Sequence, residues 1–492
     1  MPITYRNALR FRAGEEGGFY FDMEEGKIVR VFNQYVVVKP SFSPMSMLED
    51  VHGNMYLVLT SESSFDKDVA RSVEVLEEEE LRGMVLHADN ESKAIIIGEL
   101  KKMPKAGDRV RLRASFFELK SEDPVVTPLG AFDPWANRMS HVTIFAKTGS
   151  GKSVMAMYLM LLAIKKGYKI VVLDYHGEYR EMYEDLLKMG IRAIYYDVPK
   201  VDICKAPPEA LAAAFGIVQL LDKAPKMMHY MNRIAELACS SPQEIRSLFE
   251  DPVDLIRAIT EAIILLPTLE KECATSRLDN SVPKICKVLN YIRSKYSGFE
   301  YNLLKDLVDK RDRDSLESLY RYSKTLDEFR GIITIGEDIQ LEGYEAVFLN
   351  LSLAISHISY AEPIAIHAIR RVAQSPERIV LFVEEAPAFM QDVYIWRFIE
   401  NLVRQGRKFD KFVVLITQSP FEIMSQTDMI IGNLANIRYI KEVLARTPHM
   451  SDALRYILPI LPPWHFVYVS STGLIMPVKI LRKVARHSAS EI

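Results

Sequence analysis

The clearest chemistry in this 492-residue chain belongs to residues Ala146–Ser153, whose sequence is AKTGSGKS. An apolar run that predicts a buried strand (141–145) precedes it, and an apolar run that predicts a helix (154–164) follows it. A strand, a glycine-rich turn and a helix that carries Gly-Lys-Ser form the context of a phosphate-binding P-loop. Backbone N–H groups of such a loop point at phosphate oxygens. The sequence therefore predicts a nucleoside-triphosphate site.

Two side chains of this segment have predicted chemical roles. Lys152 would reach the β- and γ-phosphates of ATP, and the Ser153 hydroxyl would hold Mg²⁺. The remaining members of the predicted phosphate cradle are Thr148, Gly149, Ser150, Gly151 and Val154. Ala146 replaces the first glycine of the general pattern, and a small residue there weakens the match only slightly. An ordinary glycine-rich loop is the alternative, which the flanking strand and helix disfavour.

A second apolar strand, 379–383, ends in two carboxylates, Glu384 and Glu385. In P-loop ATPases this arrangement places the first acid near Mg²⁺ and the second where it polarises the attacking water. Neighbouring side chains of a strand point to opposite sides, so the two acids should not share one role. An acidic strand end is a weak signal alone and a strong one downstream of a P-loop.

Three further polar residues are candidates for the same chemistry. Gln418 follows the predicted strand 412–417 and could sense the γ-phosphate, with a strand-end cap as the alternative. Arg404 and Arg407 lie in a basic segment between the two strands. Arginine stabilises transferring phosphoryl charge, whereas a solvated basic helix end is the simpler interpretation.

Composition limits the class of protein. Hydrophobic residues make up 49% of the chain and charged residues 26%, as in globular proteins with large cores. The longest apolar run, 154–164, is too short for a membrane span, and no signal peptide is evident. A net charge of -3 means that DNA contacts must be local. Basic residues that could supply them, or equally be solvated surface, are Lys223, Lys226 and Arg233.

The four cysteines are Cys204, Cys239, Cys273 and Cys286. They form no C-x-x-C pair, and no histidine cluster joins them. We therefore expect buried cytosolic thiols and a cytoplasmic location.

The order of apolar patterns predicts four parts. Short apolar runs separated by turns indicate a small β-barrel over 1–125. Alternating helices and strands then predict a parallel α/β core, in two parts over 126–204 and 336–492. Between them, residues 205–335 lack strand patterns and indicate a helical insertion. Two late β-like runs, 465–470 and 474–480, close the pattern.

These motifs together resemble the HerA-type ATPases of the HerA/FtsK branch of ring translocases. The matching pieces are Thr148–Ser153, Leu173–Tyr179 (LDYHGEY), Val383–Ala386 (VEEA), Gln405–Phe409 (QGRKF) and Ile416–Pro420 (ITQSP). The stretch DYHGEY, 174–179, is the most specific, because a generic P-loop protein has no reason to carry it. The resemblance covers about residues 139–480 by motif, and the N-terminal part only by pattern.

The resemblance implies a RecA-like P-loop core and a homohexamer with ATP between subunits, which moves double-stranded DNA through its pore. Such motors usually work beside a NurA nuclease in preparing DNA ends for recombination. The implied roles are phosphate and Mg²⁺ binding by Lys152 and Ser153, activation of water by Glu385, phosphate sensing by Gln418, and a trans arginine finger at Arg407 beside Arg404. Asp174 and Glu178 match acidic positions whose role stays open.

Two departures from the family pattern suggest a specialised member. Pro387 stands where the family commonly has histidine, and Ser140 falls where some members carry a phosphate-sensing arginine, for which nearby Arg138 is a candidate substitute. A VirB4-like motor that transfers DNA or protein across a membrane is one alternative function. A nucleotide-gated scaffold with little hydrolysis is another, although a scaffold does not need a positioned base such as Glu385.

Overall fold

The computed structural model describes the paired strands within residues 3–115 by their backbone, and then residues 123–484 with gaps. The gaps are 128–129, 137, 276–281, 297–312, 353–360, 391–392, 420–425, 435, 445–457, 459–460, 462 and 471–474. Two units can be distinguished. The first contains Met1–Gly167 and Phe412–His487, and the second contains Tyr168–Lys411. Each is described by itself below.

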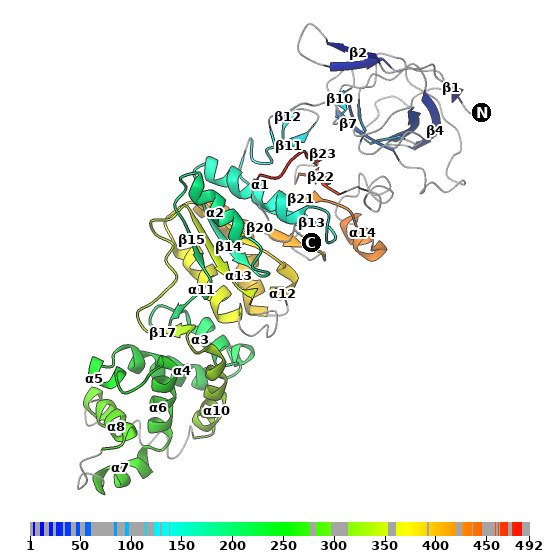
Figure 1. The fold of residues 1–492 in the computed structure, drawn as a ribbon. Coiled ribbons are helices and arrows are strands. Elements are labelled where there is room, and N and C mark those ends of the chain that lie inside the picture. The colour runs from blue at the N-terminus through cyan, green and yellow to red at the C-terminus, as the bar shows by residue number, and fades with distance from the viewer. Residues whose placement is uncertain are drawn as a thin grey trace. The chain divides into compact units, whose positions relative to one another are not determined.

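The N-terminal strands of the first unit form a sheet in the order β1-β4-β5-β9-β7-β8-β6-β10. Figure 1 labels four of these strands, β1, β4, β7 and β10. Its strands are β1 (Ile3–Thr4), β4 (Gly26–Phe32), β5 (Tyr35–Pro40), β6 (Ser46–Glu49), β7 (Met55–Thr60), β8 (Gly83–Val85), β9 (Ala94–Ile97) and β10 (Ala114–Ser115). A separate hairpin joins β2 (Arg10–Ala13) to β3 (Phe19–Asp22). Closure of the sheet into a barrel stays a prediction.

The central strand of the first unit is β13 (Val142–Phe145), and all four of its residues are buried. It pairs in parallel with β20 (Lys411–Thr417) on one side and with β21 (Asp428–Ile431) on the other. A strand buried on both faces reads as a continuous apolar run, as this one does. Antiparallel strands extend the order outward through β22 (His465–Val469), β23 (Ile475–Ile480), β11 (Val125–Thr127) and β12 (Gly130–Ala131).

Helix α1 (Lys152–Lys165) follows β13 after a six-residue loop. Its residues 154–160 are all buried, so this helix is apolar around most of its circumference. The strand, loop and helix order is the one that the sequence predicts for a P-loop.

The second unit has its own run of parallel strands in the order β19-β14-β18-β15. Their bounds are β14 (Lys169–Asp174), β15 (Ala193–Tyr196), β18 (Ala346–Asn350) and β19 (Ile379–Val383). Because parallel strands end at one edge, Asp174 is level with Asn350, and Leu173 is level with Val383. Polar residues that follow β14 and β19 are thereby brought together. The predicted α/β class of fold is confirmed.

Helices surround the strands of the second unit. They are α2 (Arg180–Lys188), which contacts β15, α11 (Ala361–Gln374), which contacts β19, α12 (Ala386–Met390) and α13 (Val393–Gln405). A 3-10 turn, η7 (Gly406–Phe409), follows α13. Within the described part of the chain, no helix has the length and apolarity needed to cross a membrane.

The segment between β15 and β18 is mainly helical (green in Figure 1). Its helices are α3 (Pro208–Ala214), α4 (Pro225–Cys239), α5 (Gln243–Arg246), α6 (Pro252–Ile264), α7 (Leu266–Thr275), α8 (Lys284–Lys295) and α10 (Arg313–Ser323). Two 3-10 turns accompany them: η2 (Val218–Leu220) lies between α3 and α4, and η4 (Lys324–Phe329) follows α10. Short parallel strands β16 (Val201–Asp202) and β17 (Ile333–Thr334) pair where the chain enters and leaves this segment. The boundaries of the four predicted parts stay predictions.

The prediction of free thiols is wrong. Cys204 is bonded to Cys239 at the end of α4, and Cys273 in α7 is bonded to Cys286 in α8, each pair with Cα atoms 5.5 Å apart. The partners are 35 and 13 residues apart in sequence, so helix packing and not local spacing brings them together. A search for C-x-x-C spacing cannot find such pairs. Disulfides are rare in cytosolic proteins other than those of hyperthermophiles, so they do not support the expected cytosolic environment.

A buried ion-pair network joins the segment after β17 to α11. Asp338 accepts hydrogen bonds from Nε2 of His367 and from Nη1 of Arg371, both at 2.6 Å. The side chains of Asp338 and His367 are only 4% and 1% exposed. Burial alone would raise the pKa of Asp338, but the hydrogen bond from His367 and the charges of His367 and Arg371 outweigh it and lower this pKa.

We expect Asp338→Asn to lower the free energy of unfolding of the second unit by about 3 kcal/mol at pH 7, because it removes the buried carboxylate that accepts hydrogen bonds from His367 and Arg371. The folded-state pKa of Asp338 is lower than the unfolded one, so its contribution is present above the unfolded value of about 3.9 and is lost as the pH falls further. Urea unfolding of the wild type and the variant, at pH 7 and at successively lower pH, measures the size of the loss and its dependence on pH. If the difference in unfolding free energy between variant and wild type does not shrink in acid, Asp338 does not stabilise the fold through its charged form.

Candidate nucleotide-binding site

The glycine-rich loop is fixed to the neighbouring strand ends by its backbone. The amide of Ala146 donates to the Thr417 carbonyl (3.3 Å), and that of Lys147 donates to the Asn433 carbonyl (2.9 Å). Ala146 is fully buried, and a Cβ atom added to Gly432 would lie only 2.7 Å from the Ala146 Cβ. The absence of a side chain at Gly432 therefore leaves space for the Ala146 methyl group, which stands where the general pattern has its first glycine.

Gly149 and Gly151 have φ angles of +78° and +96°. These lie in the left-handed region, which residues with a side chain rarely adopt, so the glycines allow the loop its curvature. Ser150 between them is only 1% exposed, and its Oγ has no hydrogen-bond partner within the described part of the chain. A curved loop with a buried hydroxyl that lacks a partner fits a phosphate group, which would accept that hydrogen bond.

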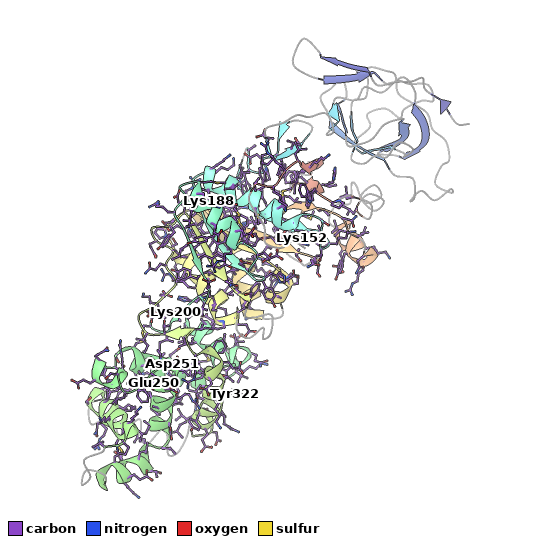
Figure 2. The ribbon with its side chains drawn as sticks, viewed as in Figure 1. Lys152, Lys188, Lys200, Glu250, Asp251 and Tyr322 are labelled. Atoms are coloured by element: carbon purple, nitrogen blue, oxygen red, sulfur yellow. A yellow bond between two sulfur atoms is a disulfide. The ribbon has the colours of Figure 1, made fainter. Side chains whose placement is uncertain are left out.

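Lys152 is the first residue of α1 (Figure 2). Its Nζ donates a hydrogen bond to the Lys147 carbonyl at 3.0 Å, so the ammonium group lies over the loop. Ser153 and Val154 follow it in the first turn, and Val154 is buried. The predicted phosphate-binding residues of the loop and helix are thus adjacent in the structure.

Gln418 lies against the same loop. β13 and β20 run in register, with Phe145 level with Thr417, so the residues that follow both strands are neighbours. Thr148 Oγ1 donates to Gln418 Oε1 at 2.8 Å. The cap of this strand end is made by Thr417, whose Oγ1 accepts from the Ser419 amide at 2.9 Å. The strand-end cap is therefore the role of Thr417, while Gln418 faces the P-loop.

The acidic residues of the second unit form a cluster at the carboxyl ends of β14 and β19. Asp174 is fully buried and accepts hydrogen bonds from the amides of Glu178 (3.0 Å) and Tyr179 (3.1 Å) and from the Tyr195 hydroxyl (3.1 Å). Asp174 thus shapes the turn that leads into α2. Burial raises its pKa, although the two amides oppose this.

The two glutamates lie in different environments, as strand alternation predicts. Glu384 is 4% exposed, and its Oε2 accepts from the His176 amide at 3.3 Å. Burial and then the negative charges of Asp174 and Glu178 raise the pKa of Glu384 well above its ordinary value. Asp174 and Glu384 are thus two neighbouring buried carboxyl groups with raised pKa values. A divalent cation bound beside such groups would stabilise their charged form.

Glu385 is more accessible, with its side chain 23% exposed and a φ of +47°. Its Oε2 lies 4.0 Å from Nε2 of His176, and this contact raises the pKa of the imidazole. Sequence reasoning did not single out His176, although it lies within the DYHGEY stretch. Within the described residues, no group of three or more histidine, cysteine and acidic side chains has the arrangement of a preformed metal centre. This is expected for Mg²⁺, which is usually bound by one or two carboxylates together with substrate phosphates.

The two candidate arginines lie in different elements, with Arg404 in the last turn of α13 and Arg407 in η7. Arg404 Nη2 donates to Glu400 Oε1 at 2.5 Å, one helical turn away, with its side chain 57% exposed. It matches the solvated helix-end interpretation. Arg407 is half-buried in η7, next to the exposed Lys408 and Phe409.

Ser140 and Arg138 lie at the opposite end of β13 from the glycine-rich loop, because they precede the strand. Ser140 is 7% exposed and its Oγ donates to Asp428 Oδ2 at 2.5 Å, so its role is structural. Arg138 is exposed at the same end. The structure therefore does not bring Arg138 to the P-loop of its own chain. Of the three basic residues suggested for DNA contact, Arg233 forms an ion pair with Glu236 (2.9 Å) on α4.

Strand β13, the left-handed glycines and the helix that begins at Lys152 define a P-loop protein of the α/β class. Residues 136–370 match the family described as "Helicase HerA, central domain". The "Probable DNA double-strand break repair helicase HerA" of Methanocaldococcus jannaschii is 23% identical over 324 residues, which cover 58% of this chain and 60% of that protein. These matches confirm the resemblance to HerA-type ATPases. The chain spans about three fifths of the length of this relative.

Solved structures with a similar arrangement include VirB4 of Thermoanaerobacter pseudethanolicus, with a TM-score of 0.46 and 14% identity, covering 74% of this chain and 97% of that one. Plasmid coupling protein TrwB in complex with ADP and Mg²⁺ has a TM-score of 0.43 and 14% identity, covering 71% of this chain and 86% of that one.

Proposed function

We propose that this chain is an ATP hydrolase that drives translocation along double-stranded DNA. The observation that carries the proposal is the P-loop itself, with its left-handed glycines and buried Ser150 hydroxyl, inside the region that matches the HerA central domain. The cluster of Asp174, Glu384 and Glu385 supports hydrolysis beyond nucleotide binding alone, because a scaffold has no need of such acids.

ATP and Mg²⁺ are the proposed substrate and metal. Lys152 and the loop amides would bind the phosphates, while the Ser153 hydroxyl and Glu384 would hold the metal. Bound Mg²⁺ supplies neutralisation of phosphate charge. The raised pKa of Glu384 supports this assignment, since a nearby cation would offset the cost of its buried charge.

The remaining residues have separate proposed tasks. Glu385, the more accessible acid, accepts a proton from the attacking water. Gln418, already hydrogen-bonded to Thr148 of the P-loop, senses the γ-phosphate. Arg407 stabilises the charge of the transferring phosphoryl group.

The resemblance to HerA-type motors supports finer proposals. We propose a homohexamer with an N-terminal barrel and a NurA-type nuclease as partner in DNA end processing. We propose the cytoplasm as its location, where the two disulfides are of the kind found in intracellular proteins of hyperthermophiles. A VirB4-like motor and a nucleotide-gated scaffold are the alternatives. DNA dependence of ATP turnover, without any membrane partner, decides among the three. Stimulation by duplex supports the translocase, and equal rates with and without DNA contradict it.

Arg407 is expected to act on ATP bound by a neighbouring subunit, because a head-to-tail ring brings one subunit's surface to the next subunit's site. Arg407→Ala and Lys152→Ala should each be inactive alone. Rings that contain both variants should regain partial turnover, at interfaces that pair an intact Lys152 with an intact Arg407. The measurement is ATP turnover across mixing ratios.

Arg404→Ala is the matched control, because Arg404 is held by Glu400 and should retain most turnover. Native mass spectrometry verifies that the rings are mixed. Verified mixed rings without any recovery, or an Arg404→Ala protein as inactive as Arg407→Ala, would contradict the trans role of Arg407.

A further inference from the structure

The residue that precedes β22 contacts the P-loop directly. The Trp464 amide donates to the Ser150 carbonyl at 2.9 Å, and the Trp464 carbonyl accepts from the Ile480 amide, also at 2.9 Å. Trp464 thus links β23 to the middle of the phosphate loop through two backbone hydrogen bonds. None of the sequence motifs includes this residue.

The indole of Trp464 packs beneath the same loop. A Cβ atom placed on Gly151 would lie 3.1 Å from Trp464 Cδ1 and 3.5 Å from Ile480 Cδ1. Gly151 immediately precedes Lys152, so this packing surface supports the point where the loop becomes helix α1.

Trp464 also has an unusual backbone conformation. Its φ of +66° makes it one of three residues other than glycine with positive φ in the described part of the chain. For a bulky residue this conformation is strained, and it persists only where the surroundings impose it. Here the hydrogen bonds to Ser150 and from Ile480 keep Trp464 in this conformation, so Trp464 is tied on one side to the phosphate loop and on the other to β23.

Ser150 is the loop residue whose hydroxyl is buried and has no hydrogen-bond partner among the residues that the structure describes. Because Trp464 holds the Ser150 carbonyl, it also fixes the orientation of that residue. We propose that Trp464 is a positioning residue, which keeps the P-loop curved for phosphate before ATP arrives. This inference rests on the proposed binding of ATP, and it concerns the phosphates and not the nucleobase.

The test compares binding of ATP with binding of inorganic triphosphate, which carries the phosphates without a base. In Trp464→Ala, the dissociation constants of both ligands should rise by about tenfold. This is the equivalent of one charge-assisted hydrogen bond, here the proposed bond from Ser150 Oγ to a phosphate oxygen. Trp464→Phe keeps an aromatic ring under Gly151 and should stay within about threefold of the wild type. Trp464→Gly accepts the positive φ without strain, keeps the backbone hydrogen bonds, and should weaken binding as the alanine variant does.

Tyr468→Ala is the matched control for loss of an aromatic side chain, because Tyr468 lies in β22, the strand that Trp464 precedes. Tyr468 packs on Phe132, with ring centroids 5.4 Å apart, and its hydroxyl donates to Asp428 at 3.1 Å, near the residues that precede β13. This variant should lower the melting temperature while leaving triphosphate affinity within about twofold of the wild type. The contacts of Tyr468 with Phe132 and Asp428 do not involve the phosphate loop, so the two effects should be independent.

A second readout uses the protein labelled with 5-fluorotryptophan. The chain has three tryptophans, and the Trp464 resonance is the one that Trp464→Phe lacks. Inorganic triphosphate should shift this resonance. Unchanged triphosphate affinity in Trp464→Ala, or a resonance that triphosphate leaves in place, overturns the positioning role. A wild-type protein that binds neither ligand would instead overturn the proposed function.

Discussion

Replacing Lys152 by alanine is expected to raise the dissociation constant of ATP by about 100-fold, which at ordinary nucleotide concentrations abolishes binding. The variant removes the charge that would meet the β- and γ-phosphates, and charge-assisted hydrogen bonds to such a group contribute about 3 kcal/mol. Lys152 begins α1, and its Nζ already lies over the loop, where it donates to the Lys147 carbonyl. Equilibrium binding of a fluorescent ATP analogue measures the effect.

Lys147→Ala is the matched control for this variant. Lys147 is exposed in the same loop, and its backbone amide and carbonyl, which make the contacts described above, survive the substitution. Its removal takes one positive charge from the loop but should change ATP affinity by no more than about threefold. An equal loss in both variants would mean that net charge, and not the position of Lys152, determines affinity.

Replacing Glu385 by glutamine is expected to preserve ATP binding and to lower turnover by about 100-fold or more, because it removes a general base. The side chain is 23% exposed, so the substitution leaves no uncompensated buried charge. The measurement is phosphate release, alongside the binding assay used for the Lys152 variant.

Glu384→Gln provides the contrast with Glu385→Gln. If Glu384 holds the metal, raising the Mg²⁺ concentration should recover part of its turnover, whereas no Mg²⁺ concentration should recover Glu385→Gln. Turnover of Glu385→Gln at nearly the wild-type rate would show that the general base lies elsewhere.

Much of the α/β core can be predicted from sequence, because strands buried on both faces read as continuous apolar runs. The predicted strands 379–383 and 412–417 correspond to β19 and β20. The two late β-like runs correspond to β22, whose five residues are all buried, and to β23. Locally determined positions, such as the left-handed Gly149 and Gly151, are equally readable, since only glycine adopts that backbone readily.

Contacts between residues that only tertiary packing brings together cannot be predicted from local sequence patterns. The proximity of Thr148 to Gln418 needs the register of β13 with β20, and the disulfides need the packing of helices. The support of the P-loop by Trp464 joins residues more than 300 positions apart, and no local pattern marks it. The hydrogen bond from Tyr195 to Asp174 depends in the same way on two strands that are separated by β18.

ATP turnover measured with different forms of DNA shows whether hydrolysis is coupled to duplex DNA. Linear duplex, closed circular duplex, single strands and no nucleic acid are compared over a range of salt. Linear duplex should stimulate most if the ring loads from an end, with little dependence on sequence, because phosphate contacts carry no base information. Stimulation should fall steeply as salt rises. Equal rates in all four conditions would contradict the account.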